Sequence, residues 1–563
     1  MSNFSSQQDV TDALSFAISH NDPNTKELFN ALKAVHEGAR SNNIPIIYPD
    51  NVAGNTDKKI CLTLYSQSLT HIPIMSSSQV DFNGWTIEIT VSSNWEGCCT
   101  PFLFLLGTNG ESNPISGIRK TAIDTGNFTD VSALNTGMKL VFIKDETPWT
   151  FRNEIENTYW PNGIFAVPWA DWNEETPKIR TDILLVKDGV AVNRPIAPYD
   201  TMQSNPVVTY VDAHENQAYF KNITFIRTPG CCKVINLAYM ARMNNVFVEK
   251  INVTTPVLPT LTNDQCLTFL KITNLTIKDV VINNTYSTAT YHGYGLLLTC
   301  IWNLTLDNVQ STNPQWGVLG CNDLNYVRLE SCDLNRFDIH CYGRDVTCVD
   351  CNFRNENSFP QPLPEVTQSP PTNHTYNRLS SFYGKLNYIR CTFDGFYPLL
   401  TDYTYNVHSG FDIYIENCSI KIYFTANAFL FRMGFWATPL NHRPEHVKRG
   451  WPNVFINGLN IMVRDGIDTV HMFFLIDRDN IGVTHPEAAI KEPIYHTSYL
   501  HVKNLSLQNM SGEEISGVSL VETNKSYTEV DYAQRVFRFV QGAEYEYTGS
   551  GEPRLELTNA DFS

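Results

Sequence analysis

The sequence lacks several features that would place it in a common class of protein. No apolar run approaches the roughly 20 residues that a membrane helix needs. The first ten residues have neither a basic start nor an apolar core, so we expect no secretory signal. Basic residues are also scarce, since 41 Lys and Arg stand against 58 Asp and Glu, a formal charge of −17. Phosphate binding needs a basic surface, which argues against nucleic acid as a partner.

Metal and disulfide patterns are equally weak, although the chain has 14 cysteines. Cys348 and Cys351 form the only C-x2-C pair. Residues three apart on a strand face opposite sides, which is unsuitable for binding one ion. We therefore expect no metal site and no cofactor.

The N-terminal segment, residues 1–58, contains an amphipathic helix. Residues 26–41 place Leu28, Leu32 and Val35 on one stripe at the helical period. A short apolar strand at 44–48 follows, and alternating strands are expected at 60–64 and 85–91. A helix in this place would cap the open end of a stacked sheet, where backbone groups are otherwise unpaired.

Residues 59–219 are expected to hold early strands with long loops or a small insertion. Within them, 96–210 is the least regular part, with strand-like pieces at 139–143 and 182–186 between loops rich in Asn, Thr, Pro and Trp. The sequence leaves the two interpretations open.

From about residue 220 to 510 a repeat is present. Short strands begin with an asparagine, at Asn222, Asn245, Asn274, Asn303, Asn325, Asn387 and Asn453. A second anchor follows each strand, at Val280, Val309, Cys332, Cys351, Cys391 and Cys418. Repeats of this kind predict a parallel β-solenoid whose coils stack in register. The cysteines then form one inward column in which valine also serves, as small buried apolar residues.

The capping helix, the strand ending in Tyr48-Pro49 and the Asn-anchored coils together resemble the pectate-lyase-like right-handed parallel β-helix superfamily. The run from Trp316 to His340 contributes most to the likeness, which is closest to tailspike and tail-fibre proteins of bacteriophages and prophages. The resemblance covers residues 26–510. Asp-Asp, Gly-His-Gly and Arg-Ile-Lys are absent, so it does not extend to the polygalacturonase machinery.

The resemblance implies an all-β, single-stranded right-handed parallel β-helix with an N-terminal capping α-helix. Regular coils would occupy residues 220–510, and 511–563 would form a C-terminal cap or interface segment. It further implies a homotrimer in the virion, assembled in the host cytoplasm with other virion proteins. Such a protein would bind, and in an enzymatic version depolymerise, a bacterial surface polysaccharide. Two alternatives stay open: a non-catalytic receptor-binding, fibre or capsid-decoration protein, and a bacterial carbohydrate-active β-helix enzyme.

One strand carries the candidate catalytic residues. In the run 336–340, Arg336, Asp338 and His340 alternate with Phe337 and Ile339. Strand alternation would place the three polar side chains together on a wet outer face.

The anchor spacing predicts the neighbours of this strand. Arg378 precedes Cys391 by the same interval as Asp338 precedes Cys351, so we expect it one coil away from Asp338. On earlier coils, the corresponding positions are assigned to Gly295 and Gly317, which would leave an open shelf for a sugar chain.

Two kinds of chemistry fit these residues. Hydrolysis needs a second carboxyl beside Asp338, for which Asp323, Asp402 and Glu356 are candidates. Elimination from an acidic sugar would use His340 as base, oriented by Asp338, with Arg336 and Arg378 neutralising the substrate carboxylate. Arg378, Asp402, Tyr405 and His408 are the candidate substrate-binding residues. The alternative is a solvated outer face whose charge pairs contribute a few tenths of a kcal/mol each.

Overall fold

The structure is a computed structural model of the 563-residue chain. It describes residues 4–64, 73–91, 102–107, 113–148, 179–195, 205–228, 235–255, 262–284, 292–311, 318–334, 337–340, 343–354, 377–379, 382–395, 400–404, 411–422, 428–435, 453–466, 469–477, 500–513, 517–523, 536–537, 544–547 and 556–558.

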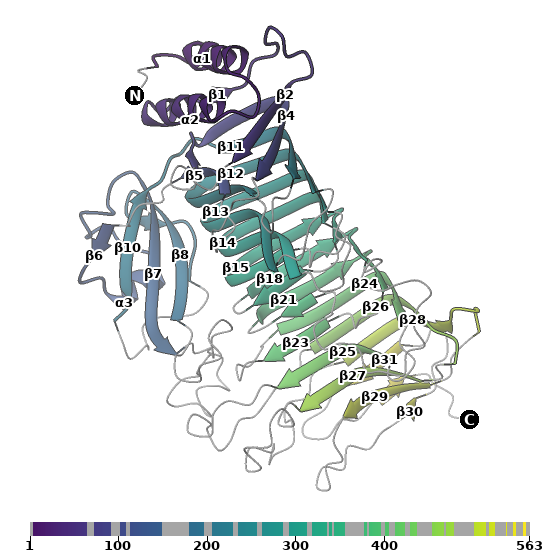
Figure 1. The fold of residues 1–563 in the computed structure, drawn as a ribbon. Helices are drawn as coiled ribbons and strands as arrows, with labels where there is room; N and C mark the ends of the chain where they lie inside the picture. The colour runs from purple at the N-terminus through teal and green to yellow at the C-terminus, as the bar shows by residue number, and fades with distance from the viewer. Residues whose placement is uncertain are drawn as a thin grey trace, which may run out of the picture.

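The chain winds into a single-stranded parallel β-helix, as expected. Two helices cap its N-terminal end, a small separate sheet lies beside the first coils, and the C-terminus lies at the far end (Figure 1). In the described residues, 27 strands belong to the β-helix and its C-terminal extension, and five to the small sheet. Each turn of the chain, here called a coil, contributes strands to three faces.

The elements fall into five groups. The helices are α1 (Gln7–His20), α2 (Lys26–Ser41) and α3 (Lys120–Thr125). Face 1 holds β3 (Ile74–Met75), β5 (Phe102–Gly107), the first parts of β12 (Asn236–Thr255), β13 (Thr262–Asn284), β14 (His292–Ser311) and β15 (Val318–Glu330), then β17 (Phe337–His340), β20 (Asn377–Leu379), β23 (Leu400–Thr404), β25 (Ala428–Phe435), β27 (Thr469–Asp477) and β29 (Gly517–Thr523).

Faces 2 and 3 share several long strands that turn a corner between them. Face 2 holds β1 (Ile46–Ile47), β18 (Gly343–Val349), β21 (Phe382–Ile389) and the first parts of β4 (Gln79–Val91), β11 (Ala218–Thr228), β24 (Phe411–Ile422), β26 (Asn453–Val463) and β28 (Leu500–Asn509), with the middle of β12–β14 and the end of β15. Face 3 holds β2 (Lys59–Leu64), β16 (Asp333–Leu334), β19 (Asn352–Arg354), β22 (Thr392–Gly395) and the ends of the shared strands.

The remaining strands lie outside the parallel stack. The small sheet has the order β6 (Asn113–Ile115), β10 (Val207–Asp212), β7 (Met138–Pro148), β8 (Ile179–Lys187) and β9 (Val190–Ala191), all antiparallel. At the C-terminal end, β30 (Val536–Phe537), β31 (Glu544–Tyr547) and β32 (Glu556–Thr558) pair antiparallel, in contrast to the parallel coils before them.

One inward column runs through the corner where face 3 begins. We use "column" for the residues at paired positions on successive coils. All its members are at least 96% buried, and four are cysteines with free thiols. The predicted register of Val280, Val309 and these cysteines is therefore confirmed. The column contains Ile223, Ile251, Val280, Val309, Cys332, Cys351, Cys391, Cys418, Leu459 and Leu505.

The thiols act as core side chains with weak hydrogen bonds. Cys391 Sγ contacts the Cys348 carbonyl oxygen at 3.4 Å, and the Cys391 amide donates to Cys418 Sγ at 3.3 Å. The hydrogen bond to Cys351 and burial raise the pKa of Cys332, and burial also raises the pKa of Cys348. Cys332 and Cys348 stay protonated and apolar as a result.

Four of the seven recurring asparagines, Asn222, Asn245, Asn274 and Asn303, occupy corners where the backbone enters the left-handed region. Asn453 begins β26, whereas Asn387 lies within β21, so assigning Asn387 to the series was wrong. Asn245, Asn274 and Asn303 have φ values of 54°, 57° and 62°, which asparagine tolerates better than most residues. The Asn303 side-chain amide donates to the Asn274 side-chain oxygen at 2.8 Å. Assigning Asn325 to this series was wrong by one residue: Tyr326 is the corner residue there, with φ 57°, and Asn325 pairs with Trp302.

The capping helix is confirmed at Lys26–Ser41, and a second helix, α1, precedes it. Ser6 and Asp9 form a capping box at the start of α1. Both helices pack on the first strands, α1 on β1 and α2 on β2 and β3. No helix in the described ranges is long and apolar enough to cross a membrane.

The cap encloses one titratable side chain. His36 on α2 is fully buried, and its ring nitrogens lie 2.8 Å from Ser76 Oγ and 2.9 Å from Tyr48 Oη. Burial lowers the pKa of His36 to about 3, because the charged imidazolium is poorly solvated there.

His36 should make the stability of the cap depend on pH. The unfolded chain takes up a proton near pH 6.5, whereas the folded chain resists until about pH 3, so acid favours unfolding between these values. Below pH 6.5, the free energy of unfolding measured in urea should fall with decreasing pH more steeply for wild type than for His36→Gln. The difference should be up to about 1.4 kcal/mol per pH unit. The exposed His20→Gln should keep the wild-type slope; equal slopes in wild type and His36→Gln would contradict the assignment.

The cysteine column predicts tolerance of small apolar residues. Because valine fills the same column, Cys351→Val should cost less than about 1.5 kcal/mol. Cys351→Ser buries a hydroxyl and should cost about 1–3 kcal/mol. Alkylation of the native protein, followed by mass spectrometry, should modify the partly exposed Cys61 and spare Cys351. Equal labelling rates would show that the column is open.

Candidate functional site

The structure brings two of the predicted residues together by register. β17 and β20 pair in parallel, with Asp338 directly opposite Arg378 on the next coil. The prediction that these residues occupy neighbouring coils, made from the spacing to Cys351 and Cys391, is confirmed. In-register positions of parallel strands lie about 4.8 Å apart along the axis.

The column that contains Asp338 differs from the predicted one on its N-terminal side. Leu319 and Leu297 occupy the positions assigned to Gly317 and Gly295. Gly295 lies two residues before Leu297 on β14, and Gly317 lies outside the described residues. Gly317 precedes Cys332 by 15 residues, whereas Leu319 precedes it by 13, the interval between Asp338 and Cys351. Leu297 precedes Val309 by 12 residues, because β15 has one extra residue at the corner where the register shifts after Thr299. The predicted open shelf is thus replaced by leucines.

The column continues with polar positions on its C-terminal side. Arg378 pairs with Thr401, and Thr401 pairs with Arg432 on the following coil. Four successive coils therefore carry Asp, Arg, Thr and Arg at one position of face 1. Two arginine positions separated by one coil lie about 10 Å apart along the axis.

Asp338 is fully buried, as are its neighbours Phe337 and Ile339. The expectation of a wet outer face at Asp338 was therefore wrong. A buried carboxylate is costly unless it is paired, so full burial distinguishes Asp338 from a solvated surface charge. The solvated-face interpretation does not hold for this residue.

The small sheet covers the outer surface of face 1 on the coils that contain β13, β14 and β15. β8 contacts β13, β14 and β15, and β17 follows on the next coil after β15. Apolar side chains form a layer between the small sheet and the β-helix. This layer consists of Leu140, Phe142, Ile183, Leu185 and Val211, with Met138, Ala213 and Trp302 packed against it.

Polar contacts fix the small sheet at the corner after face 1. Thr181 Oγ1 lies 3.2 Å from Cys300 Sγ, and the ammonium of Lys271 lies 4.8 Å from the centre of the Phe142 ring. Burial lowers the pKa of Lys271. Lys271 and Cys300 occupy equivalent corner positions on adjacent coils, with φ values of 55° and 53°.

The sequence contained an indication of this cover. The runs Leu140–Ile143 and Ile183–Val186 are continuously apolar, which is typical of strands buried on both faces. In the structure, Leu140 and Phe142 face the β-helix layer, while Val141 and Ile143 pack in a second layer with Ile123 of α3.

Of the other predicted site residues, some lie on described strands and some lie outside the described residues. His340 ends β17, and Asp402 on β23 pairs with Leu379, one position away from the Asp338 column. Asp323, a candidate second carboxyl, lies on β15. Arg336, Tyr405, His408 and Glu356 lie outside the described residues. A search of the described part of the chain finds no cluster of three His, Cys, Asp or Glu that could hold a metal ion.

Substitution of Phe142 tests whether the small sheet is held on face 1 by its apolar layer. Phe142→Ala should cost about 3 kcal/mol, because it removes a buried ring from this layer. Hydrogen exchange should accelerate in β7 and β8 and stay unchanged in β24 and β26. Val192→Ala, at a side chain that is 59% exposed, serves as the control and should change neither. Unchanged exchange in β8 of the Phe142 variant would refute the role of this layer.

Comparisons with known proteins find similar chains only among solved structures. No family model matches the sequence, and no curated protein is similar to it in sequence. The structure is similar to the tailspike gp49 of Pseudomonas phage LKA1, with a TM-score of 0.43 and 13% identity over 80% of this chain and 74% of that one.

Two further tailspike structures are similar. One is gp54 of Acinetobacter baumannii bacteriophage AP22, solved in complex with A. baumannii capsular saccharide (TM-score 0.36, 12% identity, 84% of this chain and 73% of that one). The other is gp61 of Pseudomonas phage phi297 (TM-score 0.36, 8% identity, 82% and 75%). With sequence identities and TM-scores this low, these structures assign no role to individual residues of this chain.

Proposed function

We propose that this chain is a tailspike-like protein that binds an acidic bacterial surface polysaccharide along face 1. The observation that carries the proposal is the pairing of Asp338 with Arg378, followed in the same column by Thr401 and Arg432. Arginine recognises carboxylates with a planar fork of donors, and threonine hydroxyls bind sugar hydroxyls. A rigid column with a fixed repeat suits a linear polymer whose charged groups also recur at a fixed spacing.

The burial of Asp338 supports a functional role for its carboxylate and not that of a solvated surface charge. The same column carries leucine on the two preceding coils, where an apolar side chain serves for packing. Burying the carboxylate of Asp338 at the next position costs more free energy than burying a leucine side chain there. Residues with such a cost are typical of functional sites. Asp338 stands at the boundary between the leucine positions and the polar positions of the column.

We assign catalysis, as part of this proposal, to Asp338, His340 and Arg336. In an elimination, His340 would take the proton next to the sugar carboxylate, with Asp338 orienting the imidazole and the arginines stabilising the developing charge. In a hydrolysis, Asp338 would work with a second carboxyl, for which Asp402 and Asp323 are the described candidates. Tyr405 and His408 would complete the substrate-binding surface.

The assembly belongs to the same proposal. A virion protein of this type would form a homotrimer and attach to other virion proteins after synthesis in the host cytoplasm. Light scattering would give the mass of a trimer. A non-catalytic receptor-binding protein would bind the glycan without cleaving it. A structural fibre protein would attach to the particle and would not bind the glycan.

The experiment is incubation with a panel of purified acidic capsular polysaccharides, followed by binding assays and size-exclusion chromatography of the glycan. We expect one polysaccharide to bind, and Asp338→Asn and Arg378→Gln each to weaken binding at least about tenfold. Asp307→Asn is the matched control, because Asp307 pairs with Lys278 on face 2 at 3.0 Å. Shortened glycan with an unsaturated end would identify elimination, and a new reducing end without unsaturation would identify hydrolysis.

Two results would count against the proposal. Binding that is unchanged in both the Asp338 and the Arg378 variants would move the site away from this column. Absence of binding across the panel, together with stable attachment to particles, would favour the structural fibre.

A further inference from the structure

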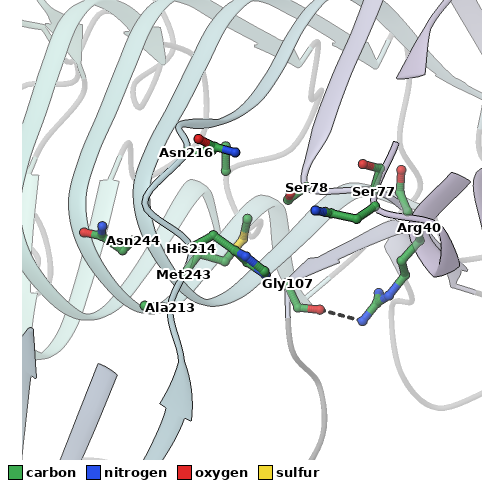
Figure 2. A pocket seen from close by; sticks show the side chains of 12 residues that line it. Arg40, Ser77, Ser78, Gly107, Ala213, His214, Asn216, Met243 and Asn244 are labelled. Carbon is green, nitrogen blue, oxygen red and sulfur yellow. Dashed lines mark hydrogen bonds between the residues drawn. The ribbon is translucent and has the colours of Figure 1, made fainter. Parts of the chain in front are cut away.

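A polar cavity of about 190 Å³ lies where the helical cap, the linker from the small sheet and the first coils meet (Figure 2). Its walls come from the end of α2, the turn between β3 and β4, the end of β5, the linker between β10 and β11, and the first corner of β12. It shares no residue with the Asp338 column. The groups that the argument uses are Arg40, Ser76, Ser77, His214 and Asn216.

Arg40 gives the cavity its charge. Its Nη2 donates to the carbonyl oxygen of Gly107 at 2.7 Å, which orients the guanidinium (Figure 2). Its Nη1 is buried and has no hydrogen-bond partner among the residues that the structure describes. Burial lowers the pKa of Arg40, while Glu37 opposes this shift. None of the described lining residues is acidic, so the cavity presents an arginine donor with no anion on its walls.

Neutral groups surround this donor. Ser76 and Ser77 are buried, at 1% and 3% exposure, and Ser76 Oγ is held at 2.8 Å from His36 Nδ1. A serine hydroxyl offers one donor and two acceptor positions, so Ser76 keeps capacity for a ligand whichever way the proton of this bond points. Exposed His214 and Asn216 reach the cavity from the linker.

The remaining wall is apolar and small. Met243, Ala213 and Ala218 contribute the apolar part of the lining, and Met243 lies beside His214 (Figure 2). One arginine, several neutral hydroxyl and amide groups and a short apolar patch match a sugar ring that carries a single carboxylate. A phosphate dianion would need more cations or converging backbone amides than this lining supplies.

We propose that the cavity binds a carboxylated monosaccharide of the hexuronate type. The Arg40 fork would bind the carboxylate, and the serines, His214 and Asn216 would bind the ring hydroxyls. This inference goes beyond the site on face 1 and does not depend on it. A variant of Asp338 that no longer binds polysaccharide should still bind the monosaccharide in the cavity.

The test is isothermal titration of the full chain with glucuronate, glucose, acetate and inorganic phosphate, each up to about 10 mM. We expect glucuronate to bind more tightly than the other three. Arg40→Gln should weaken glucuronate at least about tenfold, and Arg40→Lys should restore only part of the affinity, because the fork is lost. Arg119→Gln is the matched control, since Arg119, at the start of α3, pairs with Asp130 in the turn after this helix at 2.8 Å and has a side chain that is 72% exposed.

A second variant keeps the test decisive if Arg40→Gln loosens the cap. Asn216→Phe fills the cavity from an exposed linker position and should abolish glucuronate binding while leaving the thermal unfolding midpoint and polysaccharide binding on face 1 unchanged. Acetate or phosphate binding as tightly as glucuronate would overturn the assignment to a sugar. Glucuronate binding that survives Asn216→Phe, or no binding by wild type, would overturn the site.

Discussion

The fold depends on coils that stack in register along one axis. Each coil leaves its inward apolar side chains and its backbone groups unsatisfied until a neighbour covers them, so the stack stabilises itself only as a continuous array. The column from Ile223 to Leu505 shows this constraint clearly, because every coil contributes one buried aliphatic side chain or thiol to it. Four cysteines fit because a cysteine side chain is small and behaves as a weakly polar core residue.

Two additions complete the array near its N-terminal end. The helices α1 and α2 cover the first strands, whose backbone edge would otherwise stay open. The small sheet covers part of the side of face 1. Both bury apolar surface that the coils alone would expose. The linker between the small sheet and the coils lines the Arg40 cavity (Figure 2). The candidate cavity is thus a consequence of joining three units.

The Asp338 column shows how one position changes character along the axis. Leucine occupies it on two coils, aspartate on the next, and then arginine, threonine and arginine. Because the coils are in register, a change of residue type along a column becomes a change of surface along the molecule. The column on face 1 therefore has apolar positions on the coils of the small sheet and polar positions on the coils that follow.

The sequence by itself determined the periodic features. The anchors at Val280 and Cys351, the helical stripe of α2 and the pairing of Asp338 with Arg378 all follow from residue spacing, since spacing fixes which positions align once strands stack in parallel. This reasoning failed where a residue type was followed instead of the spacing. Tyr326, not Asn325, has the corner position that corresponds to Asn303, and Leu319, not Gly317, pairs with Asp338.

Only the tertiary structure decided what is covered. Asp338 alternates correctly with Phe337 and Ile339, yet all three are buried. Strand alternation assigns a face to a residue, but whether that face meets solvent depends on segments distant in sequence. Strands β7 and β8 of the small sheet, for example, pack against β12, β13, β14 and β15, and no local pattern in those coils encodes that contact.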